Sequence, residues 1–160
     1  MKIAPVFLCA MLAVAVCHVR AGAPEPATDL YKTLNTAATD HKMAFILLGR
    51  STCGNCNATR SMIRDGKIPV TDTDYVMADL NVDDAKVEAA FMRRFGKAQF
   101  GDTLPFVVVT DSQGKMLASS GGYKNEGQWT ALLAQAKSKA SASSDASGTS
   151  SDWPFKAAAH

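Results

Sequence analysis

The sequence predicts an α/β domain with a central mixed sheet of about four strands flanked by helices. Short apolar runs alternate with longer segments of helical periodicity, which is the pattern of parallel strands joined by crossover helices. Near the C-terminal end, a strand, a turn and a second strand predict an antiparallel hairpin in the same sheet. The chain has 160 residues, 47% of them hydrophobic, which suits one domain with tails.

The N-terminus is typical of a secretory signal peptide. Lys2 precedes an apolar run over residues 3–16, and Val19 and Ala21 have the spacing of a cleavage site. The run is short for a membrane span. We therefore expect a signal peptide over residues 1–21.

Such a signal directs export from the cytoplasm and is then removed. We expect the mature protein in the bacterial periplasm. Residues 22–26 would then form a short leader. Lipidation at Cys17 and an uncleaved membrane anchor are the two alternatives.

The charge balance argues against a nucleic-acid partner. Of the 17 Lys and Arg residues, Lys2 and Arg20 leave with the signal, so 15 remain against 15 Asp and Glu. No basic cluster with interleaved aromatic residues is present.

The first half of the mature domain predicts a helix, a strand and a second helix. Apolar residues recur at helical spacing over residues 27–42, and residues 43–48 form a continuous apolar run short enough for a buried strand. Residues 53–64 favour a helix that ends at Asp65 and Gly66.

The second half predicts a strand, a helix, a hairpin and a last helix. The expected elements are a strand at 75–82, a helix that Asp83 and Asp84 can cap, hairpin strands at 105–110 and 115–119, and a helix at about 125–139. The domain thus spans residues 27–139. We expect the Ser/Ala-rich residues 140–160 to be disordered, with the apolar Trp153-Pro154-Phe155 as either an incidental tail or a short docking segment.

Two cysteines carry the chemistry that the sequence indicates. Cys9 and Cys17 lie in the signal, so the exported chain keeps Cys53 and Cys56, three positions apart at the junction of a strand and a helix. A sulfur at a helix N-terminus is favoured as thiolate, so Cys53 would be the nucleophile. Cys56, one turn later, would resolve the mixed disulfide. The only expected cofactor is this redox-active disulfide, Cys53–Cys56.

Two other interpretations of the pair stay open. A metal site would need further ligands, and the mature chain offers only His41 and His160 as histidines. A passive disulfide is the other, although so short a loop removes little entropy from the unfolded chain.

Residues 27–139 resemble the thioredoxin superfamily. The motifs that carry the resemblance are Phe45-Ile46-Leu47-Leu48, Cys53-Gly54-Asn55-Cys56, Asp79-Leu80-Asn81-Val82-Asp83, Thr103-Leu104-Pro105-Phe106, and Gly121-Gly122 before the last helix. The resemblance implies that Pro105 is a cis-proline facing the cysteines, which would expose the backbone of Leu104 to an extended substrate peptide. An ordinary trans-proline at the start of a strand is the alternative.

The chain departs from this family around the cysteines. Thioredoxins carry a buried Asp where this chain has Leu47, and Asp79 on the adjacent strand is a candidate replacement as general base for Cys56. Otherwise Asp79 would be a solvated residue at a strand end. Arg50 is a candidate to stabilise the thiolate or an ordinary surface residue.

The residues around the pair would form the rim that partners touch. Thr52 replaces the family's Trp before the first cysteine, and Gly54 and Asn55 lie between the two, with Asn55 in place of a proline. We expect a monomeric thiol–disulfide oxidoreductase that acts on protein thiols and disulfides and exchanges electrons with a membrane-bound or soluble donor. The alternative is a non-catalytic binding module of the same fold, such as a metal-delivery or assembly factor.

Overall fold

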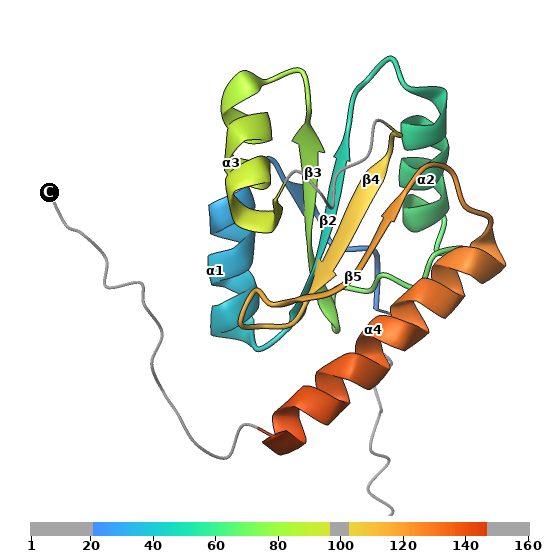
Figure 1. Ribbon diagram of the computed structural model, residues 1–160. Coiled ribbons are helices and arrows are strands. Elements are labelled where there is room, and N and C mark those ends of the chain that lie inside the picture. The colour runs from blue at the N-terminus through green and yellow to red at the C-terminus, as the bar shows by residue number, and fades with distance from the viewer. Residues whose placement is uncertain (1–20, 97–102, 147–160) are drawn as a thin grey trace, which may run out of the picture.

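A five-stranded sheet with helices on both faces forms the body of the protein. The computed structural model describes residues 21–96 and 103–146 (Figure 1). The strands are β1 (Pro26–Ala27), β2 (Met43–Gly49), β3 (Tyr75–Asn81), β4 (Phe106–Thr110) and β5 (Met116–Gly121). The helices are α1 (Leu30–Asp40), α2 (Gly54–Arg64), α3 (Ala85–Phe95) and α4 (Glu126–Ala146).

Strand β2 lies in the middle of the sheet, whose order is β1-β3-β2-β4-β5. It pairs in parallel with β3, where Leu47 is beside Asp79, and antiparallel with β4, where Leu48 is beside Phe106. Strands β4 and β5 form the expected hairpin. This mixed sheet confirms the predicted fold class and the predicted order of helices and strands.

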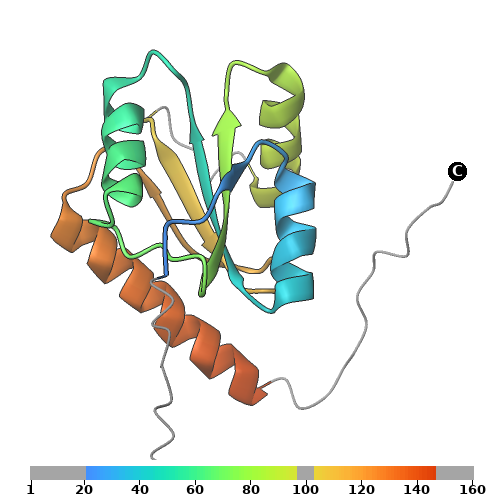
Figure 2. The same ribbon diagram turned by 180° about the vertical axis from the view of Figure 1, so that it is seen from behind.

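Two hydrophobic layers enclose the sheet. Helices α1 and α3 cover one face and α2 and α4 the other, a division that Figure 2 shows from behind. Successive β2 side chains enter opposite layers, because residues in a strand alternate between its faces. The α1–α3 layer takes Ala44, Ile46 and Leu48, whereas the α2–α4 layer takes Phe45 and Leu47. Burial on both faces explains the uninterrupted apolar run of this strand.

The structure adds one strand to the four that the sequence predicts. Pro26 and Ala27 pair in parallel with Met77 and Ala78 of β3, so the predicted leader of residues 22–26 ends inside the sheet. A proline is tolerated there because β1 is an edge strand and needs fewer backbone donors. A two-residue strand has no periodicity, which is why sequence patterns miss it.

The same segment shifts the start of the first helix. Helix α1 begins at Leu30 instead of Ala27, because the Asp29 side chain caps it by accepting a hydrogen bond from the Lys32 backbone N–H at 2.8 Å. Helix α3 is capped in the same way by Asp84, which accepts from the Lys86 N–H at 2.8 Å. Of the two predicted capping residues, Asp84 therefore performs this role.

Helix α4 corrects the predicted disorder of the tail for residues 140–146. It continues to Ala146, beyond the expected end at residue 139. Its first turn is closed by reciprocal hydrogen bonds between Asn125 and Gln128, and the buried Trp129 anchors it on the sheet. Once these turns are fixed, each residue of the Ser/Ala-rich segment adds to an existing helix without the cost of nucleation. Residues 147–160, with Trp153-Pro154-Phe155, lie outside the described residues.

The predicted signal peptide cannot be followed in the structure, since residues 1–20 also lie outside the described part of the chain. Among the residues that are described, every helix is too short or too polar to cross a membrane.

Trp129 should be a main source of stability for the α2–α4 layer. Its side chain is fully buried and meets the Phe45 ring edge-on, with 6.2 Å between ring centroids. We expect Trp129→Ala to lower the free energy of unfolding by about 3–5 kcal/mol in urea denaturation. Tyr123→Ala, which truncates an aromatic side chain that is 52% exposed, should change it by less than about 0.5 kcal/mol. Similar losses in both variants would contradict this assignment.

A salt bridge between α4 and the start of β3 should make stability depend on pH. Lys137 Nζ donates to Asp74 Oδ2 at 2.6 Å, and this hydrogen bond lowers the pKa of Asp74 below 3.8. A folded-state pKa below the unfolded value stabilises the fold above about pH 4, and the contribution is lost as pH falls through the folded pKa. Both side chains are more than one-third exposed, which limits the effect to a few tenths of a kcal/mol.

We therefore expect Asp74→Asn to be slightly less stable than the wild type at pH 7 and equally stable at pH 2. Urea denaturation at both pH values measures this difference. An equal difference at both would show that the carboxylate charge plays no part.

Candidate functional site

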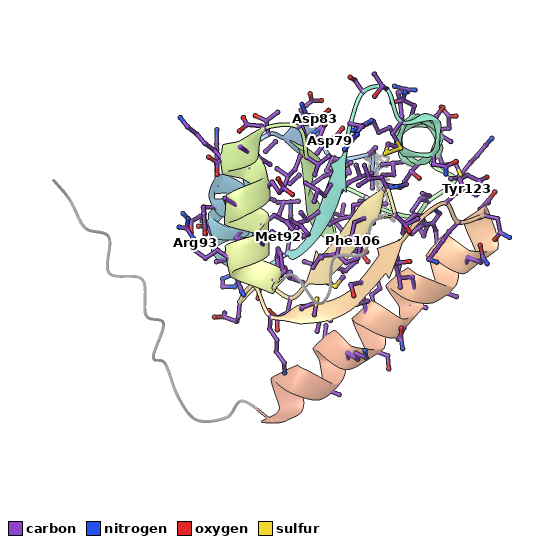
Figure 3. The ribbon with its side chains drawn as sticks, turned by 45° about the horizontal axis from the view of Figure 1, so that its top comes forward. Asp79, Asp83, Met92, Arg93, Phe106 and Tyr123 are labelled. Atoms are coloured by element: carbon purple, nitrogen blue, oxygen red, sulfur yellow. A yellow bond between two sulfur atoms is a disulfide. The ribbon has the colours of Figure 1, made fainter. Side chains whose placement is uncertain are left out.

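The cysteine pair lies where β2 passes into α2. Cys53 is the N-cap of α2, and its sulfur accepts a hydrogen bond from the Cys56 backbone N–H at 3.1 Å. The two cysteines form a disulfide with 5.2 Å between their Cα atoms. Figure 3 shows this bond in yellow beside α2. The strand-to-helix junction that the sequence predicts is therefore present, with Cys53 at the helix N-terminus.

The two cysteines differ in accessibility. Cys53 is partly exposed, whereas Cys56 is fully buried beneath it. A partner can therefore reach Cys53 more readily than Cys56. After reduction, the backbone N–H that points at the Cys53 sulfur and the positive end of the helix dipole would favour its thiolate.

Gly49, the last residue of β2, lies close against Cys56. A Cβ atom at this position would lie 2.9 Å from Cys56 Sγ and 3.2 Å from Cys56 Cβ. Only glycine leaves enough room for the buried sulfur. Sequence reasoning missed this residue, although a glycine that ends an apolar strand just before a Cys-x-x-Cys was an available signal.

Pro105 lies at the same edge of the sheet. The Leu104–Pro105 peptide bond is cis. Because Phe106 pairs with Leu48, the preceding Pro105 comes beside Gly49, at the end of β2 that leads to the cysteines. The Pro105 carbonyl accepts a hydrogen bond from the Gly122 N–H at 2.9 Å, which ties the proline to the end of β5.

Asp79 has a partner that the sequence did not reveal. Arg60 of α2 donates from Nε to Asp79 Oδ2 at 2.7 Å and from Nη2 to Asp79 Oδ1 at 2.8 Å. Asp79 is thus neither a free carboxylate nor a fully solvated strand end. In the register of the sheet it lies beside Leu47 of β2.

Arg50 also pairs with a carboxylate, because its Nε lies 3.4 Å from Asp83 Oδ1. Both side chains are largely exposed. Asp83, which the sequence offered as a helix cap, is therefore engaged with the loop before Cys53. Figure 3 labels Asp79 and Asp83, which lie near the top of that view.

The rim around the disulfide is exposed. Thr52, Gly54 and Asn55 are exposed, and Leu104 is half-buried. Tyr123 follows Gly122 directly and is one of the exposed large hydrophobic residues. These residues come from the loop before α2, its first turn and the ends of the hairpin.

The possible metal ligands do not gather within the described residues. Residues 21–96 and 103–146 contain no cluster of three His, Cys, Asp or Glu side chains that could hold a metal ion. His41 is exposed at the C-cap of α1, where its φ angle is 55°. His160 lies outside the described part of the chain.

Comparison with solved structures identifies the fold of this chain. No family model matches the chain, and neither does any curated protein that was compared with it. A solved structure of a mutant thioredoxin from Halobacterium salinarum NRC-1 is similar, with a TM-score of 0.52, 18% identity, and coverage of 73% of this chain and 96% of that one. The chain has the thioredoxin fold.

A second solved structure supports the same assignment. The germline-specific thioredoxin Deadhead from Drosophila melanogaster has a TM-score of 0.50 and 21% identity, with coverage of 66% of this chain and 89% of that one. Within the thioredoxin fold, Cys53 and Cys56 share one edge of the sheet with Leu104 and Pro105. Asp79 is linked to this edge through Arg60.

The close approach of Gly49 to Cys56 can be tested by substitution. We expect Gly49→Ala to lower the free energy of unfolding of the disulfide form by about 1–3 kcal/mol, because a methyl group must displace the buried sulfur. Urea denaturation measures this. Gly54→Ala is the control, since a Cβ there meets no atom within 4 Å. A Gly49→Ala protein as stable as the wild type would contradict the predicted crowding.

Proposed function

We propose that this protein is an exported thiol–disulfide oxidoreductase that exchanges disulfides with protein partners through Cys53 and Cys56. The observation that carries the proposal is the asymmetry of the disulfide at the N-terminus of α2, with a partly exposed Cys53 above a buried Cys56. This is the geometry that a nucleophile with its own resolving thiol requires. The similar thioredoxin structures support the same chemistry.

The reaction starts from the dithiol form. The Cys53 thiolate attacks one sulfur of a partner disulfide, an S–S bond forms between them, and the partner's other sulfur leaves as a thiolate. Cys56 then loses its proton and attacks the Cys53 sulfur. The Cys53–Cys56 disulfide forms and the partner's second sulfur leaves as a thiolate, so the partner gains two electrons and this protein loses two. The reverse sequence oxidises a partner dithiol.

The partner would bind along the rim of the disulfide. An extended segment can pair with the backbone of Leu104, next to Pro105, in the manner of an added strand. Gly54 and Asn55 would support such a segment from the first turn of α2, and Thr52 leaves more room there than a tryptophan would. Tyr123, exposed beyond Gly122, offers an apolar surface on the hairpin side.

The predicted signal peptide and the cysteine pair support a location outside the cytoplasm. A disulfide persists in an oxidising compartment, and the bacterial periplasm suits the N-terminal pattern of residues 1–21. A membrane-bound or soluble donor would return electrons to the Cys53–Cys56 pair after each turnover. The protein would act as a monomer, because the exchange needs one exposed sulfur and one resolving sulfur from the same chain.

Removal of the resolving thiol should trap the partners. We expect Cys56→Ser to accumulate mixed disulfides with protein partners in cells, because Cys53 can form them and no second thiol of the exported chain can release them. Non-reducing electrophoresis followed by reduction detects these adducts. Cys53→Ser is the matched control and should trap far fewer, since its remaining sulfur is the buried one.

An insulin-reduction assay on the wild type complements the trapping. An absence of adducts with Cys56→Ser, while Cys53 still reacts with an alkylating reagent, would overturn the proposal. Stoichiometric metal binding by the reduced protein, without insulin reduction, would instead support the binding module.

A further inference from the structure

We propose that the Arg60–Asp79 ion pair is a positioning device for Cys53. In this arrangement Asp79 of β3 holds the Arg60 guanidinium, and Arg60 holds the loop from which Cys53 projects onto the N-terminus of α2. The inference rests on the proposed redox role of the cysteine pair. It assigns Asp79 a function in holding the site, in place of the general-base role that the sequence suggested.

The contacts of Arg60 join three parts of the molecule. Its Nε and Nη2 donate to the two oxygens of Asp79 at 2.7 and 2.8 Å, which anchors it to the sheet. Its Nη1 donates to the Arg50 carbonyl at 3.2 Å and to Asn57 Oδ1 at 2.9 Å. A planar guanidinium with five N–H groups can make all four bonds at once, whereas an ammonium group lacks this fixed geometry.

Arg60 and Asn57 together bind two successive carbonyl groups of the loop before Cys53. The Arg50 carbonyl accepts from Arg60 and also from the Cys53 backbone N–H, at 3.4 Å. The Ser51 carbonyl accepts from Asn57 Nδ2 at 2.8 Å, and Asn57 is itself held by Arg60. The backbone that sets the position of Cys53 is therefore tied to α2 and, through Arg60, to β3.

Burial makes this ion pair stronger than an ordinary surface pair. The side chains of Arg60 and Asp79 are only 23% and 22% exposed, whereas those of Arg50 and Asp83 are 44% and 53% exposed. Two parallel charge-assisted hydrogen bonds add directional preference. Because the two charges compensate each other, the pair should act on the cysteines through the geometry of the loop.

We call the Arg60–Asp79 ion pair, with its hydrogen bonds to the loop before Cys53, the clamp. The clamp should stabilise the dithiol form more than the disulfide form. In the disulfide form a covalent bond holds Cys53 beside Cys56. After reduction this bond is gone, and the hydrogen bonds of the loop must keep the Cys53 sulfur in front of the Cys56 N–H. Loss of the clamp should therefore destabilise the dithiol relative to the disulfide.

The equilibrium constant of the cysteine pair with glutathione measures this effect. We expect Arg60→Gln, Arg60→Lys and Asp79→Asn each to shift the equilibrium about three- to tenfold toward the disulfide, where tenfold corresponds to about 30 mV for two electrons. The double variant Arg60→Gln with Asp79→Asn should shift it no further than the larger single shift. Arg64→Gln, an exposed arginine one turn later on α2, is the matched control and should leave it unchanged.

Asn57→Ala keeps the proposal testable if loss of the ion pair impairs folding. This exposed residue can be replaced without touching the Arg60–Asp79 contact, and its loss frees the Ser51 carbonyl. We expect a shift in the same direction, smaller than that of Arg60→Gln. Circular dichroism of each variant verifies the fold.

Three results would overturn the inference. If Arg60→Gln and Asp79→Asn shifted the glutathione equilibrium in opposite directions, the charge of each side chain, and not the geometry of the loop, would set the redox potential of the cysteine pair. If Arg60→Lys had the same glutathione equilibrium as the wild type, a positive charge at this position would be sufficient, and the geometry of the guanidinium would play no part. Slower release of the mixed disulfide in Asp79→Asn alone, with an altered pH profile, would mean that Asp79 is the base.

The glutathione measurement uses no protein partner, so it is independent of the proposed function. A wild type that equilibrates with glutathione, while Cys56→Ser traps no partner, would overturn the proposed function alone. Unchanged equilibria in all the clamp variants, with partners trapped as expected, would overturn the clamp alone.

Discussion

The burial of β2 on both faces is the constraint on which the redox site depends. Its alternating side chains belong to both hydrophobic layers, so the strand can neither slip by one residue nor tilt without moving buried side chains to the wrong face. Gly49 therefore ends the strand at a defined point. The short loop that follows delivers Cys53 to the start of α2, and the missing side chain at Gly49 accommodates the sulfur of Cys56.

Two charged side chains close to this site, Arg60 and Asp79, pair with each other. The central strand carries the apolar Leu47, and the neighbouring position on β3 carries Asp79. An acidic group thus remains close by, but it is engaged by Arg60 from the same helix that bears the cysteines. This acidic group is therefore part of an ion pair with two hydrogen bonds, not a free carboxylate.

The sequence predicted most of the fold because its strongest signals are local. The uninterrupted apolar run of residues 43–48 indicated a strand buried on both faces, and the spacing of Cys53 and Cys56 indicated the first turn of a helix. The departures are equally physical. Strand β1 consists of two residues and exists only because β3 offers an open edge, while α4 extends to Ala146 because its early turns are anchored by packing that no local pattern reveals.

The sequence alone indicated the residues of the candidate site: two cysteines at helical spacing after a strand, with a proline ahead of the hairpin. The groups that surround them became visible only in the packed domain. Arg60 and Asp79 are 19 residues apart and meet because α2 packs over β3, and Gly49 meets Cys56 because the chain turns back at the strand end. Local patterns reflect spacing along the chain, whereas ion pairs and close contacts between elements arise when packing brings distant residues together.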